Sequence, residues 1–102
     1  MEQLDRITRM ERILDETSEV LKGLNRAVER YDAVREKLRE LAEYYSSAQW
    51  RQDYADDSAG KLPAELKRGV LPQDAVYDLL EEHSRLMERL EALVERERAK
   101  PL

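Results

Sequence analysis

The sequence predicts an all-α protein in which a long helix, a short helical corner and a second helix folded back antiparallel follow one another. Apolar residues recur at helical spacing in both flanking segments, and 40% of the residues are charged while 41% are hydrophobic, a balance typical of long helices. Phe is absent and β-branched residues are few, which disfavours a sheet. The 102 residues are expected to form one domain, 1–102, a helical hairpin or bundle completed by oligomerisation.

The first helix is expected to span residues 2–45. Its apolar residues follow three adjoining seven-residue registers, which merge into one broad stripe on a helix and favour more than one packing neighbour. The registers continue through Gly23, which favours one unbroken helix; a turn at Gly23, making a hairpin, is the alternative. The registers begin at Ile7, Met10 and Ile13 and include Leu14, Val20, Leu21, Leu24, Val28, Tyr31, Val34, Leu38 and Leu41.

Residues 46–71 form the predicted corner. Ser46 and Gln49 have the spacing of a capping box, so a short helix is expected from Ala48 to Ser58. Gly60 follows at the position where a helix C-terminus favours glycine. The helix carries Trp50 and Tyr54 on one face, four residues apart, and this face is expected to pack on Tyr45.

A second, shorter helical turn is predicted from Ala64 to Arg68. Pro63 suits its first position, and Gly69 follows its end. Lys67 and Arg68 would then lie at its carboxyl end, where cations interact favourably with the helix dipole.

The second long helix is expected over residues 72–99. Pro72 suits its start, Asp74 falls in its first turn, and Lys100 and Pro101 end it. His83 lies within its apolar stripe. The apolar positions at three- and four-residue steps are Val76, Leu79, Leu80, Leu86, Met87, Leu90, Leu93 and Val94.

The corner carries a pattern that resembles a bacterial family known as domain of unknown function 4298. The resemblance extends over nearly the whole chain and implies a small all-helical protein without a known activity. The family typically has Ser where this chain has Pro72, at the start of the second long helix. The matching residues are Tyr44, Tyr45, Ser47, Trp50, Arg51, Asp53, Asp57, Gly60, Leu62, Pro63, Leu66, Lys67, Arg68, Gly69, Val70, Leu71, Asp74, Tyr77, Leu79 and Leu80.

The two long helices differ in length, and this predicts self-association. Folded back from the corner, the second helix would reach only from about Tyr45 to about Val20 of the first. The apolar stripe beyond it would lack a partner within the chain, and such a surface favours a homodimer or higher oligomer with two-fold symmetry. The candidate self-association residues are Leu4, Ile7, Met10, Ile13 and Leu14.

Charge and composition exclude several classes of function. The net charge is −5 with both signs interleaved, so no basic stripe for direct nucleic-acid binding is present. No uncharged apolar run reaches the ~20 residues that cross a bilayer, and the N-terminus lacks a secretory signal. The chain has no cysteine, so thiolate chemistry is excluded. We therefore expect a cytoplasmic protein without membrane contact.

No residue pattern indicates an enzyme or a cofactor. Phosphate-binding glycine motifs are absent, and His83, the only histidine, is expected to be a packed residue. Asp53, Asp56 and Asp57 have helical spacing that would suit a divalent cation. The favoured interpretation is that Asp53 and Asp57 instead pair with Arg51, Lys67 or Arg68. We assign no catalytic, cofactor-binding or metal-binding residue.

The sequence favours a non-enzymatic interaction or structural module that self-associates. An unidentified protein partner would bind at the corner, although the same residues would equally serve to hold the corner together. The alternative function is a small acidic regulator, antitoxin-like or phage-encoded, that inhibits a nucleic-acid-handling protein. The candidate protein-binding residues are Tyr44, Tyr45, Trp50, Asp53, Tyr54, Asp57, Lys67 and Arg68.

Overall fold

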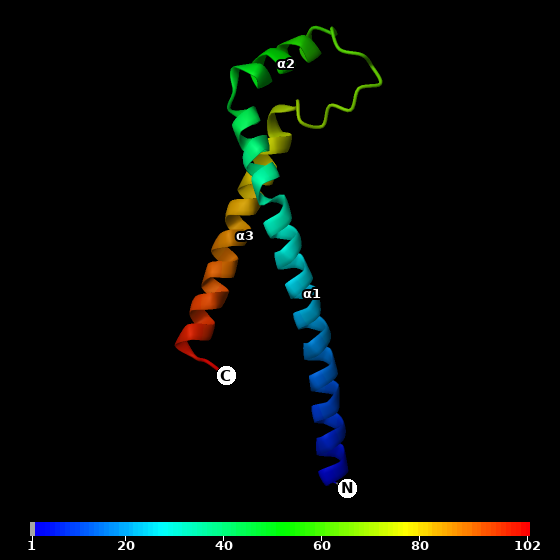
Figure 1. Cartoon of the computed structure of the whole chain (residues 1–102), viewed down its shortest axis with the longest axis vertical. Helices are drawn as coiled ribbons and strands as arrows, with labels where there is room; N and C mark the ends of the chain where they lie inside the picture. Colours follow the sequence, from blue (N-terminus) through cyan, green and yellow to red (C-terminus); the bar gives the residue numbers. More distant parts are fainter. Residues whose placement is uncertain (1) are drawn as a thin grey trace. The chain divides into compact units, whose positions relative to one another are not determined.

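The computed structural model describes residues 2–102, with Gln73 described by its backbone alone, and it confirms the all-α class. Three helices follow one another, α1 (Glu2–Tyr45), α2 (Ala48–Ser58) and α3 (Gln73–Ala99), and the described residues contain no strand (Figure 1). The chain divides into two units, one ending at Leu38 and the other running from Arg39 to Leu102.

The first unit consists of α1 as far as Leu38. The helix is unbroken through Gly23, as predicted, and Glu2 and Asp5 lie in its first turn, where carboxylates favour the positive end of the helix dipole. A Cβ added at Gly23 would meet no atom within 4 Å, so packing does not require glycine there. Most of the large apolar side chains in this unit are exposed, whereas Tyr31 and Leu38 are half-buried.

The second unit begins with the end of α1 and the start of α2. The Ser46 hydroxyl donates to the Ala42 carbonyl at 3.2 Å, and the Ser46 amide donates to the same carbonyl, so Ser46 directly follows α1 and bonds back to its last turn. The N-cap of α2 is Ser47, whose Oγ accepts the Trp50 amide at 3.1 Å. The predicted capping box at Ser46 is therefore wrong by one residue.

The carboxyl end of α2 is closed by Gly60. Its φ of 72° is in the left-handed region, the only positive φ among the described residues. The Gly60 amide bonds the Asp57 carbonyl and the Lys61 amide bonds the Asp56 carbonyl, a Schellman arrangement that satisfies the last carbonyls of α2. The predicted glycine C-cap is confirmed.

The segment between α2 and α3 contains no helix, so the predicted helical turn from Ala64 to Arg68 is wrong. Two separate turns replace it, closed by bonds from the Leu66 amide to the Pro63 carbonyl (3.2 Å) and from the Leu71 amide to the Arg68 carbonyl (3.0 Å). A single helical turn gains too few hydrogen bonds to offset its nucleation cost. The Arg68 guanidinium also occupies the Pro63 carbonyl, which a continuing helix would need.

The third helix starts at Gln73, one residue later than predicted, and Pro72 is its N-cap without a side-chain bond. Within the second unit α3 leads back past the last turns of α1 in the opposite direction (Figure 1). Leu71 (4% exposed) and Val76 (2%) are the only buried apolar residues among those described. Three of the half-buried side chains of α3, Leu80, His83 and Met87, continue the face of Val76 at helical spacing.

Candidate functional site at the corner

Three aromatic rings form one cluster at the corner. The Trp50 ring stacks on Tyr54, with 5.3 Å between centroids and 22° between planes, and it meets Tyr45 edge-on at 5.0 Å and 69°. The Trp50 indole N–H also donates to the Val70 carbonyl at 2.9 Å. Trp50 therefore joins the end of α1, the helix α2 and the segment before α3, and the predicted packing of its face on Tyr45 is confirmed.

A second connection joins α1 to α2. The Tyr44 hydroxyl donates to the Asp53 carboxylate at 2.7 Å. This hydrogen bond, together with partial desolvation and the nearby negative charge, raises the pKa of Tyr44 to about 12. The predicted pairing of Asp53 with a cation is wrong, because its partner is a neutral phenol and no ion pair reaches Asp53 among the described residues.

A third connection joins α2 to the following segment through Arg68. Its guanidinium forms an ion pair with Asp57, which confirms the predicted pairing of Asp57. The same group donates to the Pro63 carbonyl, and its Nε donates to the Leu66 carbonyl at 3.3 Å. One side chain thus satisfies a carboxylate and two backbone carbonyls, a geometry that the planar five-donor guanidinium suits and an ammonium does not.

The three aspartates of α2 have separate partners. Asp53 accepts from Tyr44 and Asp57 from Arg68. Asp56 accepts from the side-chain Nε2 of Gln52 at 2.9 Å and lies 4.0 Å from the Lys61 ammonium. Within residues 2–102, no group of three His, Cys, Asp or Glu side chains is placed to hold a metal ion. The helical spacing of the aspartates thus serves three different contacts.

A hollow of about 270 Å³, which we call the corner hollow, lies beside these contacts. Its apolar walls come mainly from the segment between α2 and α3, for which the sequence predicted a helical turn, and their four aliphatic residues were not among the predicted binding residues. The signal in the sequence was the density of aliphatic residues in a stretch rich in Gly and Pro. The lining residues are Tyr44, Asp53, Leu62, Leu66, Lys67, Arg68, Val70 and Leu71.

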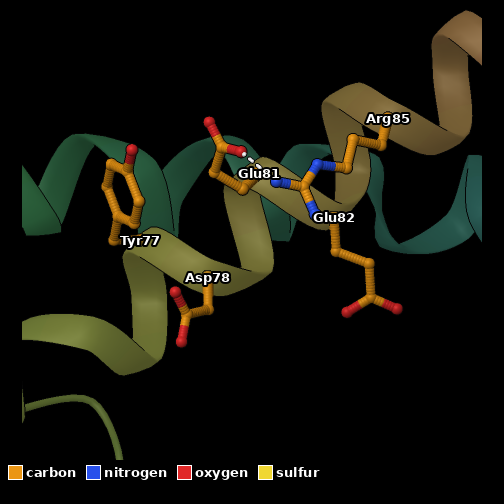
Figure 2. Close-up of a pocket in the computed structure, with 5 residues that line it drawn as sticks. All are labelled: Tyr77, Asp78, Glu81, Glu82 and Arg85. Atoms are coloured by element: carbon orange, nitrogen blue, oxygen red, sulfur yellow. Dashed lines mark ion pairs between the residues drawn. The ribbon is translucent and has the colours of Figure 1, made fainter.

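A second, larger hollow of about 470 Å³ lies on α3, lined by Tyr77, Asp78, Glu81, Glu82 and Arg85 (Figure 2). The dashed line in Figure 2 joins Glu81 to Arg85, whose charged atoms are 3.2 Å apart. Its lining is mainly acidic, and all five lining residues belong to α3. We assign it no function.

The predicted site residues fall into two groups. Seven of the eight corner residues contact one another or the backbone around them, and only Lys67 takes no part in these contacts. The five residues predicted for self-association lie on α1 in the first unit, and all are exposed. The structure thus gives most of the corner residues a structural role, and any partner binding by them stays a prediction.

Tyr44→Phe should cost about 1–2 kcal/mol of unfolding free energy at neutral pH, because it leaves the Asp53 carboxylate without its donor. The folded-state pKa of about 12 exceeds the ordinary value of 10.0. The contribution of the bond is therefore complete below about pH 10 and is lost as the pH rises through 10 to 12. Urea unfolding of both proteins at about pH 8 and about pH 11 should show the difference shrinking at the higher pH.

Ultraviolet titration provides the control for this prediction. The phenol that ionises near pH 12 should disappear in Tyr44→Phe and persist in Tyr45→Phe. A persisting component in Tyr44→Phe would contradict the assignment.

Comparison with known proteins assigns the chain to a family. The family described as a domain of unknown function (DUF4298) matches residues 7–92, and the chain belongs to it. No curated protein and no solved structure matches the chain. No helix among the described residues has the length and apolar character needed to span a bilayer. The description of the family assigns it no activity, so the exposed surfaces of the chain are the observations that bear on its function.

Proposed function

We propose that the chain is a non-enzymatic structural module that self-associates through the exposed apolar face of α1. This face, the N-terminal ridge, comprises Leu4, Ile7, Met10, Ile13 and Leu14 and continues along the first unit. The observation that supports the proposal is the exposure of the whole face, between 42% and 67% for each side chain. The residues that continue the ridge are Val20, Leu21, Leu24, Val28 and Val34.

The occupant that fits the ridge best is a second copy of the chain. At about half exposure, the ten side chains present on the order of 800 Å² per copy, the area that each partner contributes to a standard stable interface. An apolar surface of this size on a helix favours association over exposure to water. A two-fold arrangement would let each ridge cover the other, because a helix face is self-complementary in shape.

Charge also favours a second copy. Residues 2–38 contain nine acidic and eight basic residues, so the first unit is nearly neutral although the whole chain has a net charge of −5. Two first units can therefore approach without the repulsion that two strongly acidic surfaces would experience. The remaining negative charge lies in the second unit, away from the proposed interface in sequence.

The test is the oligomeric state of Ile7→Glu beside its matched control Thr8→Glu. Both substitutions add one carboxylate in the first two turns, but Thr8 lies about 100° around the helix from Ile7, outside the ridge. The wild-type chain and Thr8→Glu should be dimeric or larger at tens of micromolar by light scattering. Ile7→Glu should dissociate, with the dissociation constant raised by about 100-fold or more, because an unpaired carboxylate would be buried.

A monomeric wild-type chain at that concentration would refute the proposal. Equal dissociation of Ile7→Glu and Thr8→Glu would refute the ridge as the interface. Circular dichroism of both variants, showing equal helix content, separates dissociation from unfolding of α1.

A further inference from the structure

We infer that the corner hollow is a docking site for a peptide segment that carries one large apolar side chain next to a single carboxylate. The inference does not rest on self-association, because every lining residue belongs to the second unit and none to the N-terminal ridge. The proposed docking site does not include the aromatic cluster, because the rings of Tyr45, Trp50 and Tyr54 pack against one another.

The size and lining of the hollow indicate the apolar part of this ligand. A volume of about 270 Å³ is below that of pockets for drug-sized molecules but sufficient for one side chain such as Leu, Met or Phe. Leu66 is 47% exposed and Val70 is 39% exposed, so apolar atoms at the rim meet water unless something covers them. Single side chains that fill a small apolar pocket are the common anchors of peptide interfaces.

The charges around the hollow indicate the carboxylate. Asp53 already accepts from Tyr44, and Arg68 is held by Asp57 and by backbone carbonyls. Lys67, the remaining charged lining residue, forms no ion pair among the described residues, and its side chain is exposed. An ammonium beside an apolar hollow favours a ligand that places a carboxylate close to its apolar group.

The ligand should carry one carboxylate and not an acidic run. Residues 39–102 contain 14 acidic and 10 basic residues, the 23 and 18 of the whole chain less the nine and eight of the first unit. Such a surface repels a strongly acidic partner at long range, whereas a single carboxylate meets mainly the short-range attraction of Lys67. The net negative charge of the second unit therefore favours a peptide with a single carboxylate over a strongly acidic peptide.

The test is a two-dimensional NMR titration with N-acetyl-Leu-Asp-amide. The Trp50 indole N–H is the reporter, because it donates to the carbonyl of Val70, which lines the hollow. We expect this signal and the amides of Leu66, Lys67 and Val70 to shift with a dissociation constant of about 1 mM, as suits so small a ligand. The matched probes N-acetyl-Leu-Asn-amide and N-acetyl-Gly-Asp-amide should bind at least about tenfold more weakly.

Two variants extend the test. Lys67→Gln should abolish the preference for Asp over Asn and leave the fold unchanged, and Ile7→Glu should bind the probe as the wild type does. No shift of the reporter up to about 10 mM, equal binding of the Asp and Asn probes, or an unchanged preference in Lys67→Gln would each overturn the inference. A failure of self-association would not overturn the inference, because all residues that line the hollow belong to one chain.

Discussion

Arg68→Ala should lower the free energy of unfolding by about 2 kcal/mol, whereas Lys67→Ala should change it by less than about 0.5 kcal/mol. Arg68 forms an ion pair with Asp57 and donates to the Pro63 and Leu66 carbonyls. Its side chain is about a third exposed, so the ion pair is partly screened and the loss stays below that of a buried charge. Lys67, one residue away, makes none of these contacts.

Two further variants show whether the guanidinium geometry matters. Arg68→Lys keeps the charge but cannot reach a carboxylate and two carbonyls together, so it should recover less than half of the loss. Asp57→Ala and the double variant complete a cycle, in which we expect a coupling energy of about 1 kcal/mol. Urea unfolding followed by circular dichroism gives each value. Equal effects of Arg68→Ala and Lys67→Ala would show that Arg68 does not hold the corner together.

The helices were predictable because local rules decide them. The seven-residue registers extend through Gly23 on one helix, and the bounds of α1 and α2 follow the predicted ranges. The cap was misplaced because Ser46 and Ser47 are chemically equivalent in sequence. The choice between them depends on where the last bond of α1 falls, and the Ser46 amide still reaches Ala42. That distinction is made by backbone geometry and not by residue type.

The contacts at the corner were only partly predictable, because long side chains choose among several partners. Asp57 and Arg68 pair as expected, since opposite charges eleven residues apart meet across a turn. Asp53 pairs instead with Tyr44, nine residues earlier, because the reversal between α1 and α2 brings the phenol to it. Likewise, the Arg68 guanidinium donates to the Pro63 carbonyl. This side-chain hydrogen bond takes the place of the backbone bond that a helical turn would form there. The corner hollow follows from these choices, and the density of aliphatic residues between α2 and α3 was its only signal in the sequence.

Trp50→Ala should lower the free energy of unfolding of the second unit by about 2–3 kcal/mol. The variant removes the stack on Tyr54, the edge contact with Tyr45 and the bond to the Val70 carbonyl. The loss stays below the 3–5 kcal/mol of a fully buried Trp because Trp50 is only half-buried. Gln49→Ala, on the exposed side of the same turn, is the matched control and should cost less than about 0.5 kcal/mol.

Trp50→Phe separates the ring contacts from the hydrogen bond. It keeps an aromatic ring near Tyr45 and Tyr54 but has no donor for Val70, so it should cost about 1 kcal/mol. Amide exchange at Leu71 is the local readout, because its N–H bonds the Arg68 carbonyl within the segment that Trp50 ties to α2. Faster exchange there in Trp50→Ala, with α1 still helical, would show that the corner opens as a separate unit. Unchanged exchange would mean that Leu71 and Val76 hold the segment without the indole, and that the aromatic cluster is dispensable to the fold.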